Sequence, residues 1–172
     1  MAQNRGKQFE GVIRECFLQV PTVSLDRLHD RTDGFKGGSN ICDFIVYKKP
    51  YEYYVECKSV HGNTLSIHSI PKPDKNGELH GFYGNITDTQ YEGLLEKSKI
   101  TGVKAGILCW WVDKDVTKWI PIQAIEYMRQ KYKSIRFDVD VPYGCKYRMT
   151  DLKGRKKRIF FEYNMEAFFN EV

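Results

Sequence analysis

The sequence predicts an α/β domain in which helices flank a mixed central β-sheet. Three observations support this fold class. Segments with helical spacing alternate with β-rich runs along the chain. Residues 103–112 are almost continuously apolar, as expected of a buried central strand. Hydrophobic residues make up 41% of the 172 residues, enough for a substantial core. We therefore expect one domain over residues 1–172.

The individual elements follow from periodicity and from proline positions. Apolar residues from Phe9 onward recur at helical intervals until Pro21 ends the pattern. Pro121 suits the first position of a later helix, and Pro50 suits a turn between two strands. The elements expected, in chain order, are a helix over 9–20, strands over 22–28, 41–47, 53–58 and 65–70, a helix over 87–100, strands over 103–112 and 117–120, a helix over 121–131, and a strand over 159–163.

Two further segments have distinctive compositions. Residues 71–85 are rich in glycine and proline, which predicts a long flexible loop. Residues 146–163 are expected to form a basic hairpin with its tip at 151–158. The segment 146–158 carries seven basic residues and one acidic residue, a charge of +6, whereas the whole chain carries +5. The remaining chain therefore carries −1.

A concentrated basic segment favours binding to a polyanion. The residues expected to contact nucleic-acid phosphates at the hairpin tip are Lys153, Arg155, Lys156, Lys157 and Arg158. A solvated turn that is rich in lysine for solubility explains the same composition.

Cysteine usage and hydropathy indicate the compartment. Five cysteines, an odd number without a CxxC pair, predict reduced thiols in the core of an intracellular protein. The first ten residues are polar and lack the apolar region of a signal peptide. The apolar runs are too short to span a bilayer, so no membrane partner is expected. We expect a cytoplasmic protein.

The hairpin expected at 41–58 carries the chemistry. Strand side chains alternate between faces, so Glu56 and Lys58 share one face of their strand. A turn centred between Pro50 and Tyr51 pairs residues whose numbers sum to 101. Asp43 then lies opposite Lys58 and diagonal to Glu56, with Cβ separations of roughly 5 to 7 Å.

Two carboxylates at this separation can converge on one hard cation. Asp43, Glu56 and the backbone carbonyl of Cys57 would supply oxygen ligands to Mg²⁺, with Mn²⁺ as a substitute. Lys58 would orient a water molecule or stabilise charge on a phosphate. Alternating Glu and Lys is also ordinary on an exposed strand face, with Asp43 simply paired to Lys58.

Several short motifs resemble one nuclease group when taken in order. They are Asn4-Arg5-Gly6, Phe9-Glu10, Asp43, Glu56-Cys57-Lys58, Thr89-Gln90 and the apolar strand over 105–112. Together, from about Asn4 to about Ile125, they resemble the RecU-type Holliday junction resolvases of the PD-(D/E)xK nuclease superfamily. The compactness of the chain is more similar to phage-encoded members than to bacterial ones.

The resemblance implies a restriction-endonuclease-like fold and a homodimeric, magnesium-dependent endonuclease of bacterial or phage-infected cells. Such an enzyme nicks a four-way DNA junction symmetrically during recombination and repair. It also implies that Glu10 is a further acidic group at the metal, that Gln90 belongs to the catalytic set, and that Arg5 contacts DNA.

Each of these residues has a simpler explanation. Glu10 and Arg14 are spaced as an i,i+4 surface pair. Thr87 and Gln90 fit a capping box, and Arg5 fits a disordered N-terminus. Alternative functions are another duplex-DNA nuclease of the superfamily, restriction-like or exonucleolytic, and a non-catalytic DNA-binding accessory protein of recombination.

Overall fold

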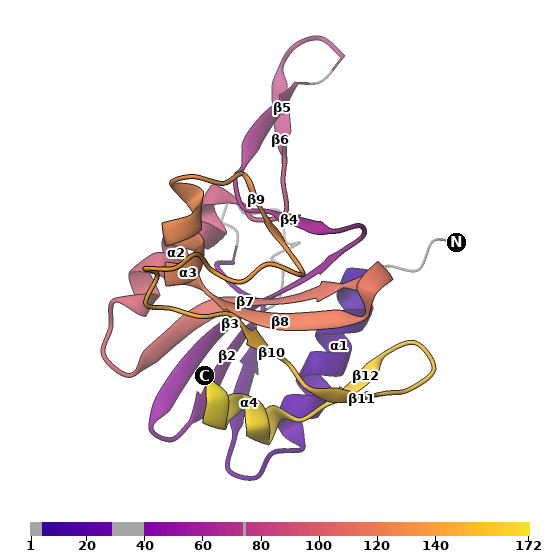
Figure 1. The fold of residues 1–172 in the computed structure, drawn as a ribbon, viewed down its shortest axis with the longest axis vertical. Helices are drawn as coiled ribbons and strands as arrows, with labels where there is room; N and C mark the ends of the chain where they lie inside the picture. Colours follow the sequence, from indigo (N-terminus) through magenta and orange to yellow (C-terminus); the bar gives the residue numbers. More distant parts are fainter. Residues whose placement is uncertain (1–4, 29–39, 74) are drawn as a thin grey trace.

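The computed structural model describes residues 5–28, 40–73 and 75–172, without the side chains of residues 79–83. Its central element is a mixed sheet of six strands among the described residues, in the order β1-β2-β3-β7-β8-β10 (Figure 1). These strands are β1 (Ser24–Arg27), β2 (Phe44–Lys48), β3 (Tyr51–Val60), β7 (Val103–Trp111), β8 (Val116–Pro121) and β10 (Thr150–Asp151). β3 and β7 are parallel, and the other neighbours are antiparallel. The α/β fold class with a mixed central sheet is confirmed.

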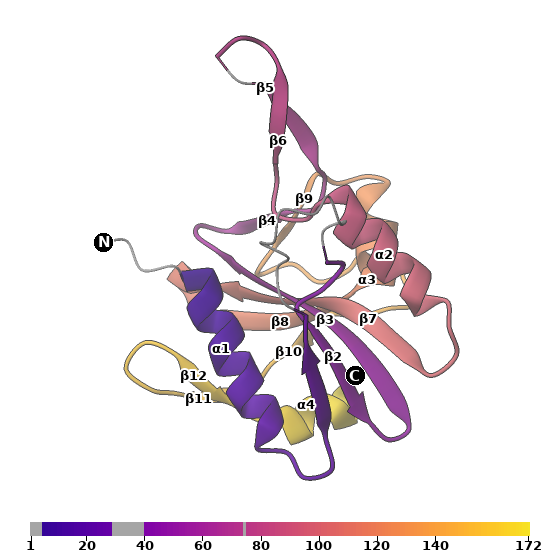
Figure 2. The same cartoon turned by 180° about the vertical axis from the view of Figure 1, so that it is seen from behind.

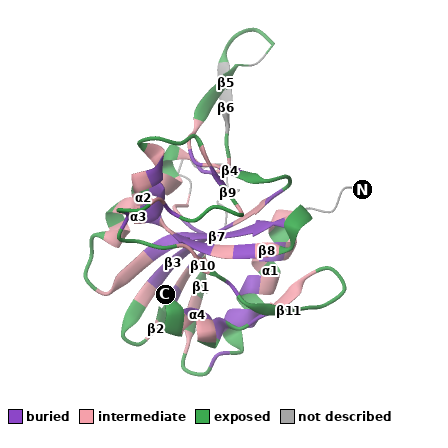
Figure 3. Cartoon of the chain, in the orientation of Figure 1, coloured by how far each residue is buried: buried purple, intermediate pink, exposed green. Residues whose placement is uncertain are grey.

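Helices cover both faces of this sheet (Figures 1 and 2). One layer holds α1 (Arg5–Leu18) and α4 (Met165–Glu171), and the other holds α2 (Asp88–Ser98) and α3 (Ile122–Arg129). The central strands β3, β7 and β8 are largely buried (Figure 3). Trp110 faces the α1 layer and Trp111 the α2 layer, since adjacent strand residues point to opposite faces.

The β2–β3 hairpin has a different register from the expected one. In the observed pairs Phe44↔Val55 and Ile45↔Tyr54 the two residue numbers sum to 99, because the turn is confined to Lys49 and Pro50. The expected sum of 101 is wrong, since Tyr51 already belongs to β3. Continued one step beyond β2, the observed register places Asp43 opposite Glu56, on the same face of the sheet.

Residues 71–85 were expected to form a loop, and that expectation is wrong for most of the segment. β5 (Ile70–Pro73) and β6 (Leu79–Tyr83) pair as an antiparallel ribbon, the β5–β6 arm, which projects from the body (Figure 1). Proline lacks an N–H group, but both strands of a two-stranded ribbon are edges and tolerate this loss. Gly77, with φ of 84°, lies in the connecting turn. At the base of the arm, β4 (Thr64–Ser66) pairs with β9 (Ser134–Arg136).

The C-terminal basic hairpin is present but shorter than expected. β11 (Gly154–Lys156) pairs with β12 (Phe161–Tyr163), so the tip covers 157–160 and not 151–158. Residues 150–151 instead form β10 and extend the central sheet. α4 follows β12 and was not expected; Asn164 caps it by accepting a hydrogen bond from Ala167 N at 3.0 Å.

The strand expected over 65–70 is interrupted, since β4 ends at Ser66 and β5 begins at Ile70. The other elements agree with expectation within a few residues. α3 starts at Ile122, so Pro121 is its N-cap and not its first residue. A short 3₁₀ turn, η1 (Val112–Lys114), connects β7 and β8. The five cysteines are free and buried, as expected. None of the helices described is both long and apolar enough to cross a membrane.

Candidate active site

Glu56 is a carboxylate on the buried central strand β3, with only 4% of its surface exposed. β3 is covered on both faces, so its residues are expected to be apolar. The Glu56 Oε1 atom accepts a hydrogen bond from Gln90 Nε2 at 2.6 Å and lies 2.7 Å from Lys58 Nζ. No described residue donates a hydrogen bond to Oε2. Both contacts from described side chains are therefore made by Oε1.

Gln90, in the first turn of α2, connects the side chains of Glu56 and Lys58. Its Oε1 accepts hydrogen bonds from Thr87 N at 3.2 Å and from Lys58 Nζ at 3.3 Å. Both of those groups are donors, and Glu56 is an acceptor, so the orientation of the Gln90 amide is fixed by its neighbours. The capping box expected for Thr87 and Gln90 is also present. Gln90 thus caps α2 and also contacts Glu56 and Lys58.

Asp43 is held just before β2, where β1 and β3 flank it. Its backbone N–H donates to Val55 O at 3.0 Å, and its carbonyl accepts from Leu28 N at 2.9 Å. Its Oδ2 accepts a 2.7 Å hydrogen bond from Cys57 N. The Asp43 carboxylate is therefore fixed beside the backbone of β3, next to Glu56. The ion pair formed by Lys58 is with Glu56 and not with Asp43.

Burial raises the pKa of Glu56 to about 8 from its ordinary value of 4.5. The positive charge of Lys58 opposes this rise, and the negative charges of Asp43 and Glu10 add to it. Three acidic groups thus act on one another across this site. A buried carboxylate among like charges is typical of a functional position.

Glu10 reaches this group from α1. Its carboxylate accepts from Arg27 Nη2 at 3.1 Å, while Arg14 pairs with Glu15 at 2.6 Å. The alternative explanation of Glu10 as an i,i+4 partner of Arg14 is therefore wrong. Arg27 was not identified from the sequence, because 17 residues separate it from Glu10 and no local pattern connects them.

The donor set fits a hard divalent cation in its chemistry. Asp43 and Glu56 offer carboxylate oxygens, and Cys57, which follows Glu56 on β3 and donates its N–H to Asp43, offers a backbone carbonyl. Mg²⁺ prefers oxygen ligands and retains several waters, so it needs few protein groups. Within the described ranges, however, no cluster of three or more His, Cys, Asp or Glu side chains is arranged to hold a metal. Glu10 therefore acts electrostatically on Glu56, but it does not form a three-residue metal site with Glu56 and Asp43.

Thiol chemistry is disfavoured at this position. Burial raises the pKa of Cys57 well above its ordinary value, and it raises that of Cys42 to about 12. The nearby carboxylates reinforce both shifts. Both thiols stay protonated at neutral pH, so they are poor nucleophiles.

The residues expected to bind DNA are Arg5 and five cations of the basic hairpin. Arg5 is the first residue of α1, and its buried Nη1 has no hydrogen-bond partner in the described structure. On the basic hairpin, four of the five cations are ion-paired with acidic side chains. The pairs are Lys153–Glu171, Arg155–Glu162, Lys157–Glu162 and Lys156–Asp115. These carboxylates offset much of the charge that the sequence concentrates there.

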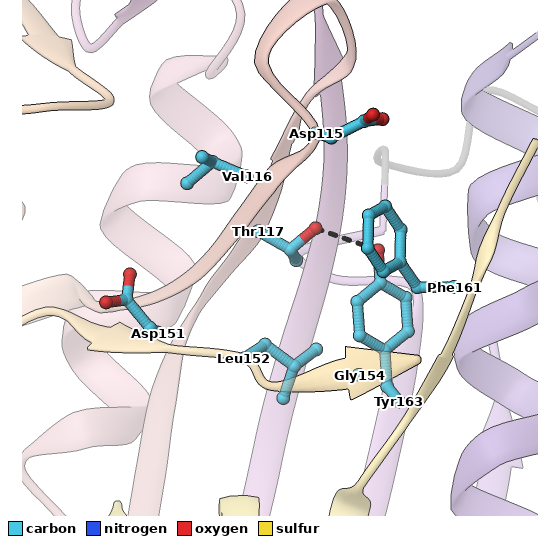
Figure 4. A pocket seen from close by; sticks show the side chains of 8 residues that line it. All are labelled: Asp115, Val116, Thr117, Asp151, Leu152, Gly154, Phe161 and Tyr163. Carbon is cyan, nitrogen blue, oxygen red and sulfur yellow. Dashed lines mark hydrogen bonds between the residues drawn. The ribbon is translucent and has the colours of Figure 1, made fainter. Parts of the chain in front are cut away.

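A pocket of about 270 Å³ lies between β8, β10 and the basic hairpin (Figure 4). The Thr117 hydroxyl and the Tyr163 hydroxyl are 2.8 Å apart beside it. Burial raises the pKa of Tyr163 above its ordinary value, so the phenol stays neutral. Tyr163 belongs to the α1 layer, whereas Glu56 and Lys58 face the α2 layer. This pocket is therefore separate from the acidic site.

Comparison with known proteins gives limited information. No family model matches the chain, and no curated protein sequence matches it. Among solved structures, the chain is similar to Hjc, a Holliday junction resolvase from the archaeal hyperthermophile Archaeoglobus fulgidus. That match has a TM-score of 0.43 and 13% identity, and it covers 69% of this chain and 78% of the resolvase. A likeness at this level says nothing about activity.

Proposed function

We propose that this protein is a divalent-metal-dependent endonuclease that hydrolyses phosphodiester bonds in DNA. The observation that supports this most directly is Glu56, a buried carboxylate held by Lys58 and Gln90 beside Asp43. Burial of an ionisable side chain costs free energy unless the group is hydrogen-bonded and paired, and a purely structural role would be served by an apolar residue. Acidic oxygens next to a fixed ammonium group match the needs of phosphoryl chemistry.

In this proposal Asp43, Glu56 and the Cys57 carbonyl hold Mg²⁺, with Mn²⁺ as a substitute. When bound, the cation would polarise the scissile phosphate and lower the pKa of a coordinated water. Lys58, oriented by Glu56 and Gln90, donates to a phosphate oxygen and stabilises negative charge that develops there. Addition of water across the P–O3′ bond leaves a 5′-phosphate and a 3′-hydroxyl.

The substrate we propose is a four-way DNA junction, cut by a homodimer in the cytoplasm of a bacterial or phage-infected cell. The support is the ordered set of motifs at Arg5, Glu10, Asp43, Glu56 to Lys58 and Gln90. A junction has approximate two-fold symmetry, and an isologous dimer can bring one acidic site to each of two opposed strands. Symmetric nicks then separate the junction into two duplexes.

Cleavage of defined substrates tests the proposal. The protein is incubated with Mg²⁺ and either a synthetic four-way junction or a linear duplex of one arm, with the Asp43→Asn variant as control. We expect paired nicks in the junction, none in the duplex, and none with the variant. The Asp43→Asn substitution keeps the hydrogen bond from Cys57 N possible, so folding is maintained.

The other outcomes identify the alternatives. Cutting of the linear duplex at a fixed sequence, or from its ends, indicates a restriction-like nuclease or an exonuclease. Binding of the junction without cleavage in either Mg²⁺ or Mn²⁺ indicates a non-catalytic DNA-binding protein of recombination. Cleavage by Asp43→Asn at the wild-type rate contradicts the assignment of the site itself.

A further inference from the structure

A second basic surface lies at the end of α3, next to the base of the β5–β6 arm. It is a hollow of about 420 Å³, which we call the α3-end pocket. Its lining includes the cations Arg129, Lys131 and Lys133, together with His68 and Ser69, and no carboxylate. A concave surface with three cations and no acidic lining attracts anions.

The turn that carries these lysines is fastened to the rest of the fold. The carbonyl of Lys133 accepts from Ile67 N at 3.1 Å, and His68 Nε2 lies 3.0 Å from the carbonyl of Tyr132. The other end is held by Met128, whose carbonyl accepts from the N–H groups of both Lys131 and Tyr132, at 3.1 and 2.8 Å. The lysines are therefore presented from a fixed backbone.

Two of the three cations of this pocket have no acidic partner among the described residues, while Arg129 pairs with Asp88. Lys131 and Lys133 are exposed, and neither forms an ion pair with any described residue. Arg129 stacks on Tyr91, with its guanidinium 3.7 Å from the ring centroid. Arg129 Nη2 is 3.4 Å from Asp88, and its buried Nη1 has no hydrogen-bond partner among the described atoms. The cations of the basic C-terminal hairpin, by contrast, are mostly neutralised by carboxylates.

The α3-end pocket is close to the acidic site through α2. Arg129 contacts Asp88 and Tyr91, and these two residues flank Gln90 in the first turn of that helix. Ile70, the first residue of β5, also lines the pocket. In Figure 1 the β5–β6 arm rises from the region where α2, α3, β4 and β9 meet. A duplex lying across Gln90 would continue between the arm and the end of α3.

We infer that the α3-end pocket binds backbone phosphates of a DNA arm that leaves the cleavage site. This inference rests on the proposed nuclease function and assigns the main phosphate contacts to Arg129, Lys131 and Lys133, in place of the C-terminal hairpin. Phosphate contacts fix the position of the duplex without reading its sequence. They release counterions, so each contact contributes about 0.9 to the salt slope of binding.

DNA binding in a metal-free buffer tests the inference separately from cleavage. Affinity for a fluorescent four-way junction and for a linear duplex is measured by anisotropy between about 50 and 200 mM salt. The Lys131→Ala/Lys133→Ala variant is compared with Lys153→Ala/Lys157→Ala, which removes the same charge from the basic hairpin. We expect the first variant to lower the slope by about 1.8 and the second to change it far less.

The controls separate the possible failures. Lys131→Gln/Lys133→Gln removes both charges but keeps a long polar side chain at each position, and it should reproduce the loss. An unchanged thermal midpoint shows that folding is intact. If the wild type binds DNA and the Lys131/Lys133 variants keep both affinity and slope, the α3-end pocket is not the contact surface. If the wild type binds neither DNA substrate, the proposed function fails, and this inference fails with it.

Discussion

Replacement of Glu56 by glutamine should stabilise the metal-free protein at alkaline pH. The folded-state pKa of Glu56 is raised, so the folded protein holds a proton that the unfolded chain releases above pH 4.5. Stability from this group is fully present below pH 4.5 and is lost as pH rises to about 8. At 1.36 kcal/mol per pH unit, the interval corresponds to about 5 kcal/mol. Glutamine has the same shape and no charge, so Glu56→Gln escapes this loss.

Chemical unfolding in a buffer with chelator, repeated from pH 4 to pH 9, measures the effect. The variant and the wild type should unfold at similar free energies at pH 4, and the variant should be more stable at pH 9. For a chain of this size, about 5 kcal/mol corresponds to a shift in midpoint temperature of roughly 10–20 °C. The same substitution at the exposed Glu126 is the matched control and should have no pH-dependent effect. A difference between Glu56→Gln and wild type that is constant with pH would refute the reasoning.

Four further substitutions, two of them combined, test the acidic site and the packing of the fold. Lys58→Ala should slow single-turnover cleavage by roughly 10²–10³-fold while DNA affinity, measured by anisotropy, changes little; equal losses in both would contradict a transition-state role. Gly93→Ala should destabilise the fold by about 1–3 kcal/mol in urea unfolding, because its Cβ would lie 2.3 Å from Ile41 Cγ2; a gain in stability would show that α2 is free to move. Tyr163→Phe should cost about 1–2 kcal/mol by removing the partner of Thr117, and Thr117→Val added to it should recover part of this loss.

The sequence predicted the main elements because their signals are local. The apolar run over 103–112 became β7, and the capping box at Thr87 marked the start of α2. The strand alternation that placed Glu56 and Lys58 on one face is intrinsic to the backbone and was confirmed. The register across the hairpin depends on whether Tyr51 extends a strand or a turn, a choice made by pairing and not by local preference. Because the expected register was wrong by two residues, it placed Asp43 opposite Lys58, whereas the observed register places it opposite Glu56.

The β5–β6 arm shows how an average rule fails in a particular setting. Pro71 and Pro73 argue against a strand inside a sheet, where each N–H group is needed. In a two-stranded ribbon every strand is an edge, so a proline whose nitrogen faces outward loses nothing. The sequence around Gly77 does not show whether the two strands joined there will form a separate ribbon or become part of a larger sheet. The missed helix α4 has a related cause, since seven residues are too few for periodicity to stand out.

Charge density along the sequence was a poor guide to charge available at the surface. Five cations near the C-terminus led to the prediction of a DNA-binding hairpin. Two of these cations, however, form ion pairs with acidic residues from other segments of the chain, Asp115 and Glu171. Lys131 and Lys133 belong to a shorter basic run at the end of α3, and the fold places them in a hollow without a carboxylate. A polyanion responds to the uncompensated charge at a surface, which depends on tertiary pairing. The chemistry proposed at Glu56 depends mainly on its neighbours along one strand, so the local sequence identifies it readily. The path proposed for the DNA depends on the whole fold, so the local sequence does not identify it.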